Sequence, residues 1–181
     1  MPRTILPGGE NISVSNHSRF RRYRKLTVLG EAAFQCCGSL KIVDISNTDL
    51  KDLYPSCFAN SGLESIKLPN SLNSIAYNCF ESCSKLCNIV LPDSLGYIGD
   101  RAFKHCGFTT LYLGPNIVNI GTEAFAESNG RLLWSSQPSI KTIGYRAFAD
   151  YKGNSLFIPD SVTKIERSAL ADCSNLREHC Q

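Results

Sequence analysis

The chain contains no apolar run that approaches the roughly 20 residues a helix needs to cross a bilayer. Residues 1–9 likewise hold no apolar stretch long enough for the core of a signal peptide. Charged residues are scarce, at 19%, while hydrophobic residues reach 43%. This balance is typical of a folded domain and argues against a disordered chain. We therefore expect a folded protein that shows no membrane span and no export signal.

Sequence patterns that carry chemistry are also missing. There is no glycine-rich phosphate loop, no zinc-protease helix and no nucleophile elbow. None of the three histidines, His17, His105 and His179, has a Ser, Cys or Asp partner at an informative spacing. No Cys-x-x-Cys pair occurs, and Cys83 to Cys87, which comes near that spacing, has one residue more between the cysteines. A metal site is therefore not expected. The sequence predicts a protein that is not an enzyme and uses no cofactor.

The net charge is small, at +3, and one segment concentrates positive charge. In residues 19–25, five of seven side chains are basic, and Phe20 and Tyr23 lie between them. Basic residues interleaved with aromatic ones can bind nucleic acid, anionic lipid or an acidic protein surface. The alternative, which we favour, is a solvated capping strand whose aromatic side chains face inward. The candidate basic patch consists of Arg19, Arg21, Arg22, Arg24 and Lys25.

The most abundant feature of the sequence is a repeated unit, seen most clearly at residues 95–106 and 139–148. A small residue followed by a large apolar one marks seven copies, and successive large residues lie 22 to 24 positions apart. A fixed period near 23 predicts a solenoid, in which each repeat is one turn that buries its apolar side against its neighbours. The seven pairs are Ala33-Phe34, Cys57-Phe58, Cys79-Phe80, Ala102-Phe103, Ala124-Phe125, Ala147-Phe148 and Ala169-Leu170.

Each turn is predicted to contain a short strand, because segments such as 89–91 show period-two alternation and β-branched residues. Pro92 follows directly and ends the strand. The apolar pair Leu95 and Ile98 predicts a second short extended piece, and residues 99–103 predict a helical or 3₁₀ turn with its aromatic side chain inward. Stacking at one period makes the first strands a parallel sheet along one side. The equivalent strand segments are 43–45, 66–68, 111–113 and 156–158.

Most of the nine cysteines occupy fixed positions of the repeat. Cys57 and Cys79 stand in the small slot that alanine fills in other copies, where a free cysteine behaves as a small hydrophobic residue. We expect buried free thiols rather than a disulfide framework, because many repeats carry no second cysteine to pair with. A second group stands three positions after the large apolar residue and comprises Cys37, Cys83, Cys106 and Cys173.

Short polar side chains form another column, two residues after the proline position. Such side chains bond neighbouring backbone groups in turns. Stacked turn on turn, they are expected to satisfy loop amides that have no partner in the sheet. The column comprises Ser71, Ser94, Asn116, Ser139 and Ser161.

The unit L-x-x-I-x-L-P-x-S-L-x-x-I-G-x-x-A-F-x-x-C resembles the BspA-type, or Treponema-pallidum-type, leucine-rich repeat over residues 26–176. Tyr54, Ala76 and Glu166 replace the glycine in some copies, so that position does not strictly require a positive φ. The resemblance implies a leucine-rich-repeat solenoid with a parallel β-sheet on one face. It also implies an adhesion role at the surface of bacteria or protozoan parasites. We divide the chain into an N-terminal cap or interrupted first repeat, 1–25, and an array of about seven repeats, 26–181.

The outward positions of the predicted sheet are the candidate binding face. Val90, Tyr112 and Phe157 are apolar at positions where the core has no use for them. Such a patch commonly marks a protein contact, although β-propensity alone also favours these residue types, and both interpretations stay open. One outward column comprises Asp44, Lys67, Val90, Tyr112, Ser135 and Phe157. The adjacent outward column comprises Ile42, Ser65, Asn88, Thr110, Leu133 and Ser155.

The function predicted from these features is a non-enzymatic module that binds another protein through its sheet face. By resemblance it is a surface or secreted adhesion protein. The alternative is an intracellular scaffold built into a larger assembly such as the cytoskeleton, which the missing export signal and the free thiols favour. Leu176 begins a turn that does not finish, and another molecule could complete it. Nucleic-acid binding through residues 19–25 is the weakest of these hypotheses, and the partner's identity is not predicted.

Overall fold

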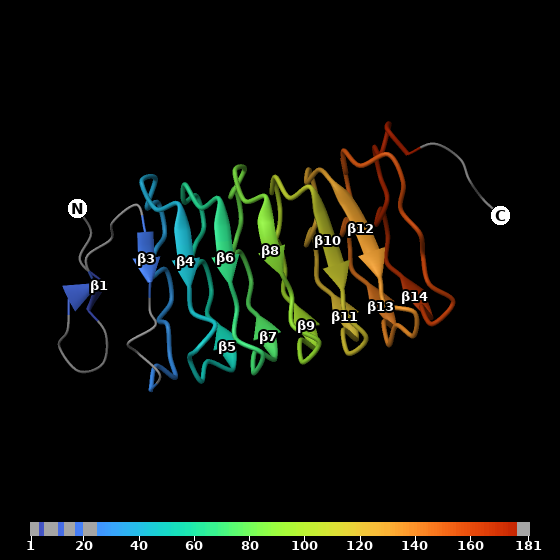
Figure 1. Cartoon of the computed structure of the whole chain (residues 1–181). Helices are drawn as coiled ribbons and strands as arrows, with labels where there is room; N and C mark the ends of the chain where they lie inside the picture. Colours follow the sequence, from blue (N-terminus) through green and yellow to red (C-terminus); the bar gives the residue numbers. More distant parts are fainter. Residues whose placement is uncertain (1–3, 6–10, 13–16, 20–24, 177–181) are drawn as a thin grey trace.

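The computed structural model describes residues 4–5, 11–12, 17–19 and 25–176 as a parallel β-solenoid (Figure 1). The turns from β4 to β13 each place one strand in a front sheet and one in a second sheet, and equivalent strands lie side by side along the long axis. The predicted leucine-rich-repeat solenoid is therefore confirmed. The front sheet pairs four strands in parallel and in sequence order: β3 (His17–Arg19), β4 (Ile42–Asp44), β6 (Ser65–Lys67) and β8 (Asn88–Val90). The parallel pair β10 (Thr110–Leu113) and β12 (Arg131–Trp134) continues it beside β8.

The second sheet consists of six parallel strands of two residues each, again in sequence order. They form at the predicted second extended pieces and confirm that prediction. Their bounds are β5 (Asp52–Leu53), β7 (Ser74–Ile75), β9 (Tyr97–Ile98), β11 (Asn119–Ile120), β13 (Thr142–Ile143) and β14 (Lys164–Ile165). Ahead of the front sheet, β1 (Thr4–Ile5) and β2 (Asn11–Ile12) form an antiparallel pair.

The turn around each large apolar residue is neither α-helical nor 3₁₀, so the predicted helical turn is wrong. No helix of either kind occurs in the described range 25–176. The backbone is left-handed two residues before and two residues after the large residue. Around Phe103, for example, Arg101 and His105 both have φ of 54°. The same pair of left-handed positions recurs in all seven turns, occupied by ordinary side chains rather than glycine.

This alternation turns every second N–H group toward the next turn. The N–H groups of Arg101, Phe103 and His105 donate to carbonyls of the following turn, with N···O distances of 2.8, 2.8 and 2.9 Å. The N–H groups of Ala102 and Lys104 instead donate to carbonyls three residues back in their own turn. A third hydrogen-bond ladder thus runs along the solenoid beside the two sheets. Local sequence predicted a helical turn because the partners that pull the N–H groups outward lie about 22 residues away.

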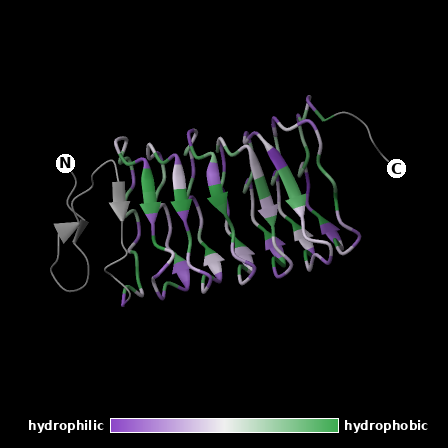
Figure 2. Cartoon of the chain, viewed as in Figure 1, coloured by the Kyte–Doolittle hydropathy of each residue, from purple (hydrophilic) through white to green (hydrophobic). Residues whose placement is uncertain are grey.

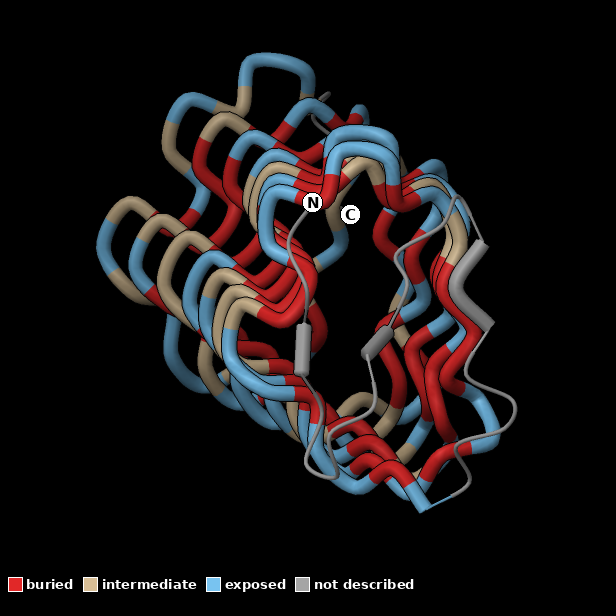
Figure 3. Tube along the Cα trace, turned by 90° about the vertical axis from the view of Figure 1, so that its left-hand side faces the viewer, coloured by how far each residue is buried: buried red, intermediate tan, exposed pale blue. Residues whose placement is uncertain are grey.

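A stack of aromatic rings fills the centre of the solenoid. Neighbouring rings are nearly parallel, with interplanar angles of 2–12° and centroid distances of 5.2–5.6 Å. The predicted inward aromatic column is therefore confirmed. Figure 3 shows the buried residues, in red, along the inner side of the stacked turns. Offset aromatic contacts of this kind contribute about 0.5–1.5 kcal/mol each beyond their buried area. The stack consists of Phe34, Phe58, Phe80, Phe103, Phe125 and Phe148.

Two repeat positions are explained by close contact between turns. A Cβ placed on Gly99 would lie 2.7 Å from the carbonyl carbon of Ala76, although Gly99 is not among the residues with positive φ. Gly99 therefore serves close approach between turns, and the expectation that this position does not require a positive φ is confirmed. Ser71 and Ser94 donate their hydroxyl hydrogens to carbonyls of the preceding turn, at 2.8 and 2.6 Å. The polar column thus satisfies carbonyl oxygens rather than the amides we expected, and the buried Oγ of Ser161 has no hydrogen-bond partner in the described chain.

The predicted strand at 156–158 does not form, and residues 151–160 contain no strand at all. The indole N–H of Trp134 donates to the carbonyl of Phe157 at 2.7 Å and so occupies a group that a strand partner would use. Leu156 and Ile158 are only partly buried against the core. Their incomplete burial leaves this segment with less packing to hold an extended ladder.

Candidate protein-binding face

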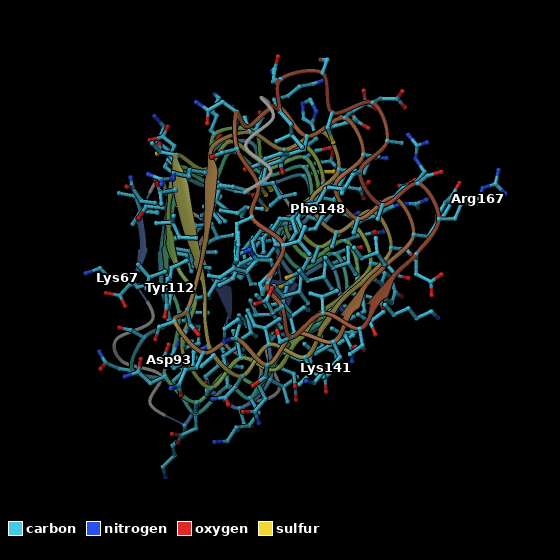
Figure 4. All side chains as sticks on the ribbon, turned by 90° about the vertical axis from the view of Figure 1, so that its right-hand side faces the viewer. Lys67, Asp93, Tyr112, Lys141, Phe148 and Arg167 are labelled. Atoms are coloured by element: carbon cyan, nitrogen blue, oxygen red, sulfur yellow. The ribbon has the colours of Figure 1, made fainter. Side chains whose placement is uncertain are left out.

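From β8 to β10 the front strands alternate between core and solvent. On β10, Leu111 and Leu113 are fully buried, whereas Thr110 and Tyr112 are exposed. Hydrophobic residues, coloured green, occur on the front strands from β4 to β12 in Figure 2. Figure 4 shows Lys67 and Tyr112 on the outer side of the front sheet, with Phe148 in the interior. The outward residues Val90, Thr110 and Tyr112 therefore take no part in the core.

Four large apolar residues are exposed on this side of the solenoid, and we call them the apolar row: Val90, Tyr112, Leu133 and Phe157. Their exposed fractions are 77%, 42%, 37% and 64%. Tyr112 and Leu133 are direct register partners. Val90 stands at the equivalent repeat position on the neighbouring strand β8. Phe157 belongs to the next turn, and its carbonyl accepts a hydrogen bond from the indole N–H of Trp134, which follows Leu133 on β12.

Leu133 belongs to this row instead of Ser135, so the predicted register of the sixth strand was wrong by two residues. β12 begins six residues after Phe125, whereas β10 begins seven residues after Phe103. Gly130 permits the shorter connection, because its φ is +92° and a Cβ there would lie 1.9 Å from a backbone oxygen of the preceding turn. The connection is one residue shorter, so it accounts for one of the two residues of the register error. Ser135 is buried, at 8% exposure.

Lys67 continues the apolar row toward the N-terminus, since it is the register partner of Val90 and its side chain is exposed. Asp44 is the next residue in line. We expected Asp44 to face solvent, but it is only 7% exposed, and its carboxylate accepts hydrogen bonds from the N–H and hydroxyl of Ser46. The available charge at this end of the row is therefore that of Lys67.

The adjacent outward column is polar. Ile42 and Ser65 are half-buried, and Asn88, Thr110 and Ser155 are exposed. On β12 this column is occupied by Arg131, the register partner of Thr110 on β10. Sequence analysis had placed Leu133 there and did not identify Arg131. Arg131 is exposed and takes part in none of the described ion pairs, and the same holds for Lys67.

The candidate basic patch is only partly within the described structure. Arg19 ends β3 and is the register partner of Asp44, and Lys25 is exposed. Arg21, Arg22 and Arg24 lie outside the described residues. Of the patch, Arg19 therefore lies in the front sheet, on the edge strand β3.

All eight cysteines within the described residues are free, and most are buried as predicted. The thiols of Cys83, Cys106 and Cys173 donate to carbonyls of the preceding turn, with S···O distances of 3.0–3.1 Å. Burial raises the pKa of Cys57 to about 12 and also raises the pKa of Cys83. These thiols are therefore protonated structural donors rather than nucleophiles. Cys36 and Cys87 are exposed.

An open depression of about 520 Å³ lies where the aromatic turns meet the loops leading back to the front sheet. Its charged residues pair with one another: His105 with Glu127 at 3.7 Å, and Lys152 with Asp150 at 3.8 Å. The Cys106 thiol beside them is hydrogen-bonded to a backbone carbonyl, and its pKa lies well above the ordinary value because of burial. No group of three metal-ligating side chains occurs in the described parts of the chain. The depression offers no poised nucleophile among the residues described.

The stacked parallel strands, the inward aromatic column and the repeated strand-proline-turn unit define a leucine-rich-repeat protein. The family model of the BspA type leucine rich repeat region matches residues 13–131 and 134–179, with six copies. The chain belongs to this family. The break between the two matched segments falls within β12, where the register shifts.

Two solved structures have the same architecture. A leucine-rich repeat protein from Bacteroides ovatus ATCC 8483 is 27% identical, with a TM-score of 0.77 over 88% of this chain. This chain spans 44% of that protein's length. The T. pallidum leucine-rich repeat protein TpLRR is 16% identical, with a TM-score of 0.54 over 98% of this chain and 88% of its own, and it shows the fold alone. No curated protein matches the chain. Among the described residues, no helix is long and apolar enough to span a membrane.

Proposed function

We propose that this chain is a non-enzymatic interaction module that binds a partner protein through the apolar row. The observation that carries the proposal is the exposure of Val90, Tyr112, Leu133 and Phe157 in one line on the front sheet. The opposite faces of these strands supply the core, so packing does not require large apolar residues outside. An apolar line rimmed by polar residues is typical of a protein contact.

The rim of the row supports the same function. Asn88, Thr110 and Arg131 flank it on one side, and all three are exposed. A partner that covers the row removes apolar surface from water, which contributes about 25 cal/mol per Å² buried. Tyrosine and arginine are the residue types most often found to dominate such contacts. Tyr112, at the centre of the row, is therefore the proposed anchor.

The test is capture of the partner from source-cell extract, comparing the native chain with Tyr112→Asp/Phe157→Asp. We expect the double variant to lose the captured protein, because it buries two carboxylates without partners. Tyr145→Asp is a matched control, since Tyr145 is 43% exposed and Tyr112 42%, and Tyr145 follows β13 on the second sheet. Equal capture by the native chain and the double variant would overturn the proposal.

A second candidate, a scaffold role within a larger assembly, is favoured by the last described turn. Ile165 on β14 is 51% exposed, whereas its register partner Ile143 is fully buried. Leu170, at the end of the aromatic column, is 37% exposed. Exposed apolar side chains of this kind suit contact with another chain. Crosslinking through the thiol of Ile165→Cys in native material would test this role. We expect a crosslink to another protein chain, and its absence would contradict the role.

The adhesion role implied by the family depends on export. Asn11 and Asn16 begin the sequons Asn11-Ile12-Ser13 and Asn16-His17-Ser18. Glycans on either asparagine in native material would support the exported adhesion protein and count against the intracellular scaffold. Mass spectrometry of the purified native chain decides between them.

A further inference from the structure

The apolar row lies in line with one unpaired cation and beside another, and its residues repeat at a regular distance. Resting on the proposed function, we infer that the segment bound by the row is an amphipathic α-helix that lies along the solenoid axis. The helix carries an acidic residue one turn beyond the end of its apolar ridge. The inference combines the spacing of the row with the positions of Lys67 and Arg131.

The spacing of the row is set by the sheet rather than by its side chains. Val90, Tyr112 and Leu133 stand on the neighbouring strands β8, β10 and β12, and neighbouring strands in a sheet lie about 4.8 Å apart. The two intervals from Val90 to Leu133 therefore span about 10 Å, and Phe157 follows in the next turn, outside any strand. Any partner that contacts the three strand residues must present apolar side chains at this same interval.

An α-helix meets this requirement. Its rise is about 1.5 Å per residue, so side chains at positions i, i+3 and i+7 follow one face over about 10 Å. An extended segment does not, because side chains on one of its faces recur about every 6.7 Å and two intervals cover about 13 Å. A polyproline helix, at about 9.3 Å per turn, is further from a match. Strand addition is also unsuited here, because it needs a sheet edge and the row is on a face.

Two exposed cations give the helix a preferred chemistry. Lys67 stands directly in line beyond Val90, about one strand spacing away. That distance corresponds to three or four residues of a helix, so an acidic side chain one turn beyond the apolar ridge reaches the Lys67 ammonium. Arg131 stands two residues before Leu133 on β12 and offers its guanidinium to an acid on the flank of the same helix.

A second copy of this chain is a poorer occupant. Two copies packed face to face with opposed axes would set Lys67 of one against Phe157 of the other. The described outward columns of the front sheet offer only one carboxylate, that of Asp44, which is buried and hydrogen-bonded. The cations would then be covered without acidic partners, which is costly.

The experiment selects random displayed peptides of about 16 residues, roughly four helical turns, on the full chain. Peptides that also bind Tyr112→Asp/Phe157→Asp are removed. We expect the surviving peptides to carry apolar residues at i, i+3 or i+4, and i+7, with Asp or Glu one turn beyond. Their affinity should fall about tenfold or more on Tyr112→Asp, a central anchor, and a few-fold on Lys67→Glu. It should be unchanged on Tyr145→Asp.

The outcomes separate this inference from the proposed function. Tyr112-dependent peptides with period-two apolar spacing would overturn the helix and leave the binding face standing. A peptide whose affinity survives a central proline, which breaks a helix, would do the same. Self-association through the row, seen as a Tyr112-dependent dimer in sedimentation, would replace the helix by a second copy. Failure to select any Tyr112-dependent peptide would overturn the helix, and failure of cell-extract capture as well would overturn both.

Discussion

The two halves of the front sheet share one backbone arrangement and differ in what they show to solvent. On β4 and β6, the outward line consists of a buried carboxylate, Asp44, and an exposed ammonium, Lys67. From β8 onward, the same line consists of Val90, Tyr112 and Leu133. The inward residues are equivalent in both halves, so the core does not explain the difference. Exposed outward residues can vary because they do not pack in the core. We therefore expect binding where these residues are large and apolar, as they are from β8 onward.

Both halves of the front sheet share one continuous core. Substitution of a buried and of an exposed phenylalanine tests which residues belong to it. Phe103→Ala should lower the free energy of unfolding by about 3–5 kcal/mol, because it leaves a cavity in the aromatic stack. Phe157→Ala should change it by no more than about 0.5 kcal/mol, since Phe157 is 64% exposed. Urea unfolding followed by circular dichroism measures both. Similar losses from the two substitutions would place Phe157 in the core.

A second difference between the halves lies inside them, because the buried thiols are concentrated in the N-terminal turns. The pKa of Cys57 is raised from 9.0 to about 12 by burial, so the folded state keeps its proton where the unfolded state releases it. This stabilisation is complete below pH 9 and is lost as the pH rises toward about 12. The loss is about 1.4 kcal/mol per pH unit for each such thiol.

Hydrogen exchange above pH 9 should therefore show the amides of Phe58 and Phe80 losing protection before those of Phe125 and Phe148. Cys57→Ala, which restores the residue of other repeats, should reduce the alkaline loss. Uniform loss of protection along the solenoid would contradict this difference between its halves.

A charge placed inside the apolar row should make the C-terminal half resemble the N-terminal half. Val90→Lys should weaken partner capture by about tenfold, because an ammonium is buried in the contact without a partner. It should leave the free energy of unfolding within about 0.5 kcal/mol, as Val90 is 77% exposed. Quantitative capture and urea unfolding are the measurements, and a few-fold effect of Lys67→Glu is the comparison. A larger effect at Lys67 than at Val90 would move the contact to the other half.

The smallest effect is expected at the basic N-terminal stretch. Arg21→Glu/Arg22→Glu/Arg24→Glu should leave partner capture unchanged at all salt concentrations, because we favour a solvated capping role for residues 19–25. Capture repeated across a salt series measures this. Loss of a salt-sensitive component in the variant would instead assign a binding function to the basic patch.

The fold was largely predictable from the repeat. Phe103 and its equivalents are inward, the second extended pieces became β7 and β9, and Cys57 and Cys79 are buried in the small slot. These features recur in every turn, so one pattern constrains them many times over. The turn around Phe103 was predicted wrongly, because its hydrogen-bond partners lie one period away and no local pattern reports them.

The candidate face was predictable only in part. Val90, Tyr112 and Phe157 were found by alternation within their strands. Leu133 was assigned to the adjacent column and Arg131 was missed, because the outward residues of β12 lie two positions earlier than the sequence analysis placed them. Asp44 was expected at the surface and is buried. Burial of an outward residue depends on what lies over it, which alternation along a strand does not report.

By itself, the sequence determined the solenoid, the direction of its core and the residues of one turn, because a period near 23 leaves each turn no other way to bury its apolar side. Only the tertiary structure decided the alternating backbone of the aromatic turns, the register of β12 and the continuous line from Val90 to Phe157. These features depend on hydrogen bonds and contacts between neighbouring turns. Such contacts join residues that are distant in sequence and lie about one strand spacing apart in space.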